Sequence, residues 1–323
     1  MIRTALRVFG ATTLLLLAGH GPAAAWQPDR AIRVIVPFAA GGPSDTIARI
    51  VATEMSAVLH QPVYIDNIPG AGGATGVKRF LEEAYDSHTL LVGHMGTHGA
   101  APALKSDIGY DPVKDFAAIG LAASTPMVIT VAPKLGVKDL AGLSVLMRTR
   151  GSEMHIAHAG QGSVSHAAAM LLQSSFGTTA ALSSYQGTGP ALNDLLADKV
   201  DILIDQIVNI APAIAAKRVQ ALAVVGSRRS EILPSVAATG ELGFNVEMNA
   251  WNAFFAKKDT PPDEIATINA ALRYALNDPR SRARLLDLGA DIPDDDAGTP
   301  GALAKLVKEE VERWAEPHLE IRR

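Results

Sequence analysis

The sequence predicts an α/β protein with a doubly wound sheet in each of two lobes. Strand, turn and helix alternate three times between residues 32 and 98, and a second run of such units follows between residues 137 and 225. Three further helices are expected near the C-terminal end. This alternation is typical of open parallel sheets covered by helices, which bind ligands at the carboxyl ends of their strands. The turns that follow the strands are therefore the candidate site.

The first unit runs from a buried strand through a glycine turn into an amphipathic helix. Residues 32–36 are a near-continuous apolar run, and apolar side chains recur at helical spacing over residues 47–59. Pro43 suits the first helical position, where no N–H is needed. Gly41 and Gly42 allow close backbone approach, and free N–H groups at a helix start attract anions. The turn predicts a carboxylate or phosphate site. It is neither G-x-G-x-x-G nor a P-loop, so a nucleotide is not indicated.

The first 25 residues have the features of a secretory signal peptide. Arg3 and Arg7 precede an apolar run that is shorter than the roughly 20 residues of a membrane span. Residues 23–25, three alanines, offer the cleavage site, so we expect export and cleavage after Ala25.

Composition limits the function classes. Hydrophobic residues make up 48% of the 323-residue chain, which fits a packed globular protein long enough for two domains. A net charge of −4 and a pI near 6.1 argue against a nucleic-acid or anionic-membrane surface. The absence of cysteine excludes a lipoprotein anchor, a catalytic thiol and disulfides.

The remaining elements follow from the same patterns. Further strands are expected at 61–67, 89–93, 118–121, 126–131, 154–158, 181–185, 200–205, 220–225 and 249–255. Helices are expected around 77–81, 137–147, 163–176, 262–277, 279–288 and 299–314, the last three opened by proline or a capping residue. We expect the chain to cross between lobes near 124–130 and 248–256. This assigns residues 26–125 and 251–323 to lobe 1 and residues 126–250 to lobe 2.

The combined pattern resembles the substrate-binding proteins of tripartite tricarboxylate transporters, the TctC or Bug family. The matching stretches span the mature chain in the family's order: residues 36–42 with Asp45, 67–73, 93–98, 110–116, 160–166, 185–187, 200–205 and 222–224. The resemblance implies a type II periplasmic binding protein, a monomeric "Venus flytrap" without cofactor or metal. It would close on a small organic acid and deliver it to membrane permease subunits.

One departure from the family concerns charge. Gln186 stands where the family usually has a basic residue, and none of the turns at 37–45, 67–73, 93–98, 158–166 and 185–189 contains Lys or Arg. An anion must then be held by peptide N–H groups, hydroxyls and helix ends, each helix end being worth about 0.3–1 kcal/mol. Three carboxylates would be poorly compensated, so we expect a mono- or dicarboxylate rather than citrate.

The expected ligand-binding residues come from turns of both lobes. They are Phe38, Ala39, Gly41, Gly42 and Thr97 in lobe 1, and Gln161, Gly162, Ser163, Ser165, Tyr185, Gln186 and Asp205 in lobe 2. Gly41→Val is expected to abolish binding by filling the approach to the turn. Tyr185 could instead pack in the core, and Asp205 could bind a ligand amine, a hydroxyl or water. Asp45 is interpreted as an acid favoured by the helix dipole.

The sequence also contains residues that could suggest a hydrolase or a zinc site, and a sensor is an alternative to a transport protein. Ser163, Ser165 and His166 could suggest a hydrolase, but they form no G-x-S-x-G elbow. His94 and His98 have the i, i+4 spacing of a zinc helix, but they lack the following Glu and a third ligand. We therefore expect neither catalysis nor a metal. The alternative within binding proteins is a sensor that presents its closed form to a signalling receptor.

Overall fold

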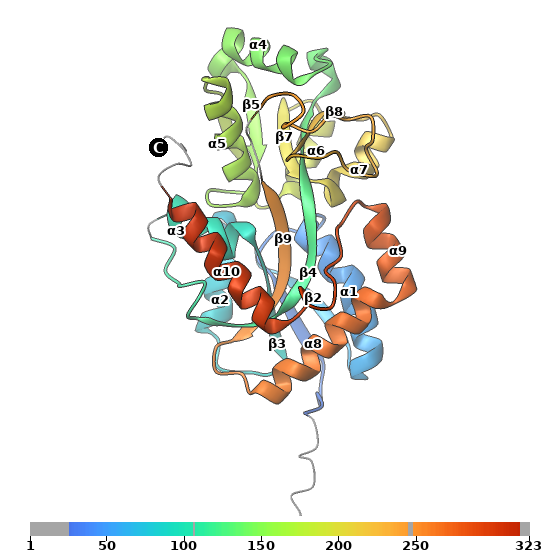
Figure 1. The fold of residues 1–323 in the computed structure, drawn as a ribbon. Coiled ribbons are helices and arrows are strands. Elements are labelled where there is room, and N and C mark those ends of the chain that lie inside the picture. The colour runs from blue at the N-terminus through green and yellow to red at the C-terminus, as the bar shows by residue number, and fades with distance from the viewer. Residues whose placement is uncertain (1–25, 106, 245–247, 317–323) are drawn as a thin grey trace, which may run out of the picture.

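The computed structural model describes residues 26–105, 107–244 and 248–316 (Figure 1). The predicted signal peptide and its cleavage after Ala25 lie outside the described residues. Among the described helices, none combines the length and apolar character that crossing a membrane requires.

The elements follow the predicted order of alternating strands and helices. The strands are β1 (Ile32–Val36), β2 (Val63–Asn67), β3 (Thr89–His94), β4 (Phe116–Val131), β5 (His155–His158), β6 (Ala181–Ser184), β7 (Ile202–Gln206), β8 (Gln220–Val225) and β9 (Asn249–Lys257). The helices are α1 (Pro43–Leu59), α2 (Ala74–Glu82), α3 (Ala101–Leu104), α4 (Leu140–Arg150), α5 (Val164–Phe176), α6 (Thr188–Leu196), α7 (Ile207–Ala215), α8 (Pro262–Asn277), α9 (Pro279–Asp287) and α10 (Pro300–Ala315).

Two sheets share strand β4. The lobe 1 sheet has the order β2-β1-β3-β9-β4, with β1 parallel to β2 and β3, and with β9 antiparallel to its neighbours. In the lobe 2 sheet, β4 lies between β8 and β7, followed by β5 and β6. Figure 1 shows β4 and β9 running along the middle of the molecule, with α4–α7 at one end and α1, α2 and α8–α10 at the other.

Strand β4 corrects one prediction. Residues 118–121 and 126–131 belong to a single strand of 16 residues instead of two. Up to Pro126 it pairs with β9, and from Met127 onward with β7 and β8. The small residues between the two predicted strands resemble a connection, but β9 pairs with them through two register shifts. The lobe boundary predicted at 125/126 remains a proposal, and this change of partner supports it.

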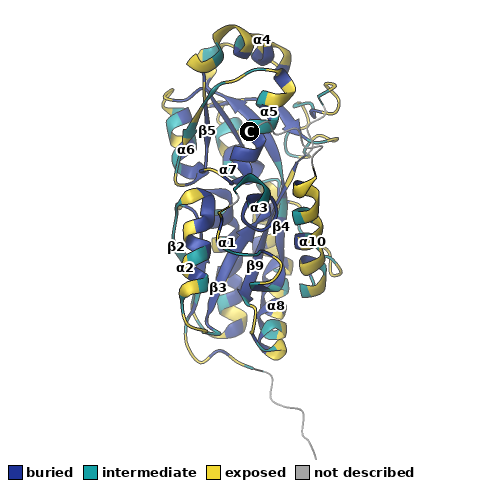
Figure 2. Cartoon of the chain, turned by 90° about the vertical axis from the view of Figure 1, so that its left-hand side faces the viewer, coloured by how far each residue is buried: buried dark blue, intermediate teal, exposed yellow. Residues whose placement is uncertain are grey.

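Helices cover both faces of the sheets, which explains the continuous apolar strands. In β1, Ile32, Val34 and Val36 belong to one hydrophobic cluster with residues of α1 and α8, whereas Ile35 belongs to a second cluster with residues of α2 and α10. Figure 2 shows this buried interior along both lobes and exposed residues mainly on the outer helix faces. A strand covered on both sides gains from apolar residues at successive positions.

Two helices differ from the predictions. Helix α7 was not predicted, because its sequence is apolar on all sides and contains Pro212. Helix α4 begins and ends three residues later than expected, since Asp139 caps it by accepting from Gly142 N. Helices α8, α9 and α10 each begin with a proline, as predicted.

Candidate functional site

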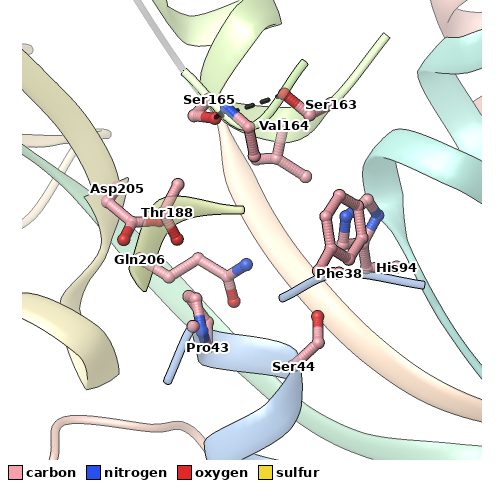
Figure 3. Close-up of a pocket in the computed structure, with 12 residues that line it drawn as sticks. Phe38, Pro43, Ser44, His94, Ser163, Val164, Ser165, Thr188, Asp205 and Gln206 are labelled. Atoms are coloured by element: carbon pink, nitrogen blue, oxygen red, sulfur yellow. Dashed lines mark hydrogen bonds between the residues drawn. The ribbon is translucent and has the colours of Figure 1, made fainter. Parts of the chain in front are cut away.

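A cavity lies between the two lobes at the carboxyl ends of several strands (Figure 3). It encloses about 320 Å³ of empty space, including the space at its mouth. Its lining residues come from both lobes: Phe38, Gly42, Pro43, Ser44, His94, Ala159, Ser163, Val164, Ser165, Thr188, Asp205 and Gln206. None of these described lining residues is Lys or Arg, in keeping with the charge pattern of the turns.

Four helices begin at the cavity. They are α1 at Pro43, α5 at Val164, α6 at Thr188 and α7 at Ile207, and each contributes a lining residue at its first position or at its N-cap. Helix α5 is capped by Ser163 Oγ, which accepts from His166 N. The other three helices have no side-chain cap. Their first N–H groups need partners from outside the helix, and these N-terminal ends carry partial positive charge.

The turn before α1 is shaped by Asp45. Its carboxylate accepts from Gly41 N at 2.9 Å, from Asn67 Nδ2 at 3.0 Å and from the Arg49 guanidinium. Although burial opposes ionisation, these hydrogen bonds lower the pKa of Asp45. Asp45 therefore acts on the conformation of the turn, and it is not among the residues lining the cavity.

His94 is held against Phe38 on the lobe 1 side. The two rings stack with centroids 4.7 Å apart. Thr97 N donates to His94 Nδ1 at 3.0 Å, which leaves the proton of the neutral imidazole on Nε2. Burial lowers the pKa of His94 to about 4, so the ring is neutral at physiological pH. His94 is thus a neutral donor in the wall of the cavity.

Asp205 places a carboxyl group on the lobe 2 side. It is buried at the end of β7, and Asn209 Nδ2 donates to its Oδ2 at 2.6 Å. Burial raises the pKa of Asp205 to about 6, because its hydrogen bonds only partly offset the loss of hydration. The group can change its protonation state close to neutral pH.

The lobes touch on both sides of this cavity. On one side, Ala39 N donates to Gln186 O at 2.9 Å, and a Cβ added to Gly189 would lie 2.7 Å from Ala40 O. On the other side, a Cβ added to Gly72 would lie 2.0 Å from Gln161 O. The described arrangement is therefore closed, with glycines at the points of closest approach.

The structure brings five of the twelve predicted binding residues to the cavity wall. These are Phe38, Gly42, Ser163, Ser165 and Asp205. Ser165 Oγ accepts from Ala159 N at 2.9 Å and lies 3.2 Å from Ser163 Oγ (Figure 3).

The other seven predicted residues lie around the cavity without lining it. Ala39, Gln161, Gly162 and Gln186 belong to the turns where the lobes meet, and Gly41 is exposed. The hydroxyl of Thr97 is buried behind His94, with its Oγ1 2.9 Å from His98 Nδ1. Tyr185 Oη donates to Asp194 at 2.9 Å, away from the cavity. Gly41 does not line the cavity and a Cβ there would meet no atom within 4 Å, so the loss of binding expected for Gly41→Val stays a prediction.

Sequence reasoning missed seven lining residues. Three of them carry polar groups beside a predicted turn: Ser44 and Thr188 in the first turns of α1 and α6, and Gln206 directly after Asp205. Their positions could have indicated them, because each lies one or two residues after a glycine or a strand end that the sequence analysis assigned to the site. The others are His94, Pro43, Ala159 and Val164, of which Pro43 was assigned only a helix-starting role.

The hydrolase and zinc patterns have other structural explanations. Ser163 and Ser165 bond to each other and to backbone N–H groups, while His166 Nδ1 lies 3.5 Å from Gly162 N. His98 stacks on Phe255 at 4.1 Å instead of facing a shared site with His94. Within the described ranges there is no group of three or more potential metal ligands.

Comparison with known proteins identifies the family. Residues 47–319 match the family model "Tripartite tricarboxylate transporter family receptor", TctC. The chain belongs to this family. MatC from Rhodopseudomonas palustris, solved with bound malate, is 40% identical to this chain, with a TM-score of 0.88, over 91% of this chain and 100% of MatC. The periplasmic binding protein BugD is 33% identical, with a TM-score of 0.88, over 91% and 98% of the two chains.

A further solved structure extends the range of ligands in these relatives. A protein of R. palustris with adipate is 27% identical to this TctC chain, with a TM-score of 0.84, over 89% of this chain and 95% of that one. The two-lobed α/β architecture of this chain is therefore that of periplasmic solute-binding proteins, and its relatives are binding proteins and not enzymes.

Proposed function

We propose that this protein captures a small mono- or dicarboxylate in the interlobe cavity and delivers it to the membrane permease subunits of a tripartite tricarboxylate-type transporter. The observation that carries the proposal is the convergence of four helix N-termini on one cavity, three of them without a side-chain cap. Such ends supply unpaired N–H donors and partial positive charge to an anion.

The side chains that line the cavity favour a ligand with one or two carboxylates over a ligand with three. Hydroxyls, an amide and a neutral imidazole face the cavity, but none of the described lining residues is Lys or Arg. Asp205 adds negative charge when it is ionised. An ion that leaves water without full compensation costs several kcal/mol. The malate and adipate of the two R. palustris proteins are both dicarboxylates, which supports the same ligand class here.

A ligand screen tests the proposal. Thermal unfolding is measured with acetate, lactate, succinate, malate, adipate and citrate, and each ligand that shifts the midpoint is titrated by calorimetry. A ligand present at 100 times its Kd stabilises the folded state by about 2.7 kcal/mol. We expect a mono- or dicarboxylate to bind more tightly than citrate. The absence of binding by all six acids, or tightest binding of citrate, would contradict the proposal.

Delivery is tested separately from capture. Detergent-solubilised permease subunits are incubated with immobilised protein, with and without the ligand identified in the screen. We expect ligand-dependent retention, because a docking surface formed by lobe closure exists only in the closed state. Capture of a signalling receptor in place of the permease would instead support the sensor role. The predicted signal peptide and the likeness to the periplasmic binding protein BugD support a periplasmic location. We expect light scattering to give the mass of a monomer.

A further inference from the structure

A buried hydrogen-bond network joins the interlobe strands to the cavity. Thr125 on β4 and Asn252 on β9 are both fully buried. Both donate to one atom: Thr125 Oγ1 lies 2.6 Å and Asn252 Nδ2 lies 2.7 Å from Gln206 Oε1. The donors stand where β4 and β9 lie next to each other, close to the change of partner in β4.

This network fixes the direction of the Gln206 carboxamide. Because Oε1 accepts two hydrogen bonds from the interlobe strands, the amide nitrogen must point the other way. Gln206 lines the cavity, and Figure 3 shows its carboxamide among the other lining side chains. Nε2 carries two donors, and both hydrogen bonds that the described residues make with the Gln206 side chain go to Oε1 and not to Nε2. Nε2 is not one of the described side-chain atoms that are both buried and without a partner, so it is open to the cavity and can donate to a ligand there.

The same network reaches the first turn of helix α1. Ser44 Oγ donates to Asn252 Oδ1 at 2.7 Å, and Asn252 in turn donates to Gln206. Ser44 lies in the first turn of α1, which also lines the cavity. All four side chains are buried, and a connected buried network holds its members in one arrangement.

We propose that Gln206 is a specificity-determining residue whose amide nitrogen binds a ligand carboxylate, and that Thr125 and Asn252 are positioning residues that keep this nitrogen turned into the cavity. This inference rests on the proposed function, because it assigns a donor to the carboxylate site. Thr125 and Asn252 act through Gln206 and do not themselves line the cavity.

The first test exchanges the nitrogen for oxygen. Gln206→Glu keeps the shape and still accepts from Thr125 and Asn252, but it presents an oxygen to the ligand. Calorimetry compares malate with its monoamide. We expect the Kd for malate to rise by at least about 10-fold to 100-fold, the range expected for losing a hydrogen bond to a charged group, because the new carboxyl group also repels the ligand when it is ionised. The monoamide should lose less, so the preference for malate over its amide should fall.

The positioning residues are tested with a matched pair. Thr125→Val preserves the shape of the side chain but removes its hydroxyl, so the Gln206 carboxamide is less firmly held. We expect the preference for malate over its monoamide to fall, but by less than in Gln206→Glu. Thr125→Ser retains the hydroxyl and should restore the wild-type ratio. The inference would be overturned if the ratio of the Kd for malate to the Kd for its monoamide were the same in the wild type, Gln206→Glu and Thr125→Val. Carboxylate binding itself would still stand in that case.

A second measurement needs no ligand. In side-chain amide NMR spectra, with Gln206 assigned from the resonances lost in Gln206→Glu, hydrogen exchange is measured for the two amides. We expect protection of Asn252 Nδ2, which is hydrogen-bonded, and rapid exchange at Gln206 Nε2. Protection of Gln206 Nε2 with rapid exchange at Asn252 would overturn the assignment of the amide. If no carboxylate binds the wild-type protein, the proposed function fails, and this measurement still decides the orientation.

Discussion

Asp205 is the residue whose protonation should make ligand binding depend on pH. With its pKa raised to about 6 by burial, the carboxyl is neutral in acid and charged above pH 6. A bound carboxylate disfavours the charged form further, so binding takes up a proton. The affinity for a fully ionised ligand should therefore fall as the pH rises from about 6.5 to 8.5, by at most about tenfold per pH unit for one proton. Calorimetry in buffers of different ionisation enthalpy measures this uptake.

The control is Asp205→Asn, which can still accept from Asn209. It should remove the pH dependence and increase the affinity at pH 7.5. His94 does not titrate in this range, because its pKa is about 4. Without ligand, the folded state binds the Asp205 proton more tightly than the unfolded state, whose pKa is near 3.8. Stability should accordingly fall as the pH rises from about 4 to 6 in the wild type, and less in the variant. An unchanged pH profile in Asp205→Asn would contradict the assignment.

Of the two turn glycines that the sequence analysis assigned to the site, Gly42 lines the cavity and Gly41 does not. Gly42 has an extended backbone, with φ −90° and ψ 177°, and a Cβ there would lie 3.5 Å from Thr188 Oγ1. Gly42→Val should fold normally and lose at least about tenfold in affinity, because its methyl groups extend beyond this contact into the cavity. Gly41 has φ 82°, so substitution there strains the turn and should lower the unfolding temperature. Calorimetry and thermal unfolding of the two variants separate these effects.

The start of helix α6 shows how an element can be required for closure. Gly189 is its second residue and approaches Ala40 O across the lobe interface. Alanine favours a helix over glycine by about 1 kcal/mol, so Gly189→Ala should leave the fold at least as stable. Its Cβ should nevertheless hold the lobes apart and weaken ligand binding. Small-angle scattering should show a larger radius with ligand than for the wild type.

A matched control exists in α10. Gly301 is likewise the second residue of its helix, but a Cβ there meets no atom within 4 Å. Gly301→Ala should gain the same helix stability without changing affinity or closure. Equal affinity of the two variants would show that the approach at Gly189 is not needed for binding.

Helices and strands could be predicted from the sequence where they depend on neighbouring residues, and could not where they depend on distant ones. The first turn of α1, the cap of α5 and the prolines of α8–α10 could be predicted because each depends on neighbouring residues. Helix α7 and the middle of β4 could not, because apolar surroundings and pairing with β9 override Pro212 and the small residues. The same limit applies to the site. Turn glycines are visible in the sequence, but Gln206 is recognisable only through partners on β4 and β9.

The whole molecule can be locked in its closed form. The chain contains no cysteine, so an introduced pair has no competitor. A Cβ at Gly187 would lie 3.4 Å from Ala39 Cβ, near the 3.5–4.5 Å usual for a disulfide. Ala39→Cys with Gly187→Cys should therefore cross-link the lobes on oxidation. Dissociation of ligand trapped before oxidation should slow by at least about tenfold, and reduction should restore it. Unchanged dissociation in the oxidised protein would show that ligand leaves without separation of these turns.

The continuity of β4 has a consequence for how the halves move. The same strand is the edge strand of the lobe 1 sheet and a central strand of the lobe 2 sheet, so the two sheets are joined through a continuous hydrogen-bonded strand. The connection between the lobes through β4 is a hydrogen-bonded strand and not a flexible linker. We therefore expect separation of the lobes to bend or twist β4 without breaking it, so that the same turns meet again on closure.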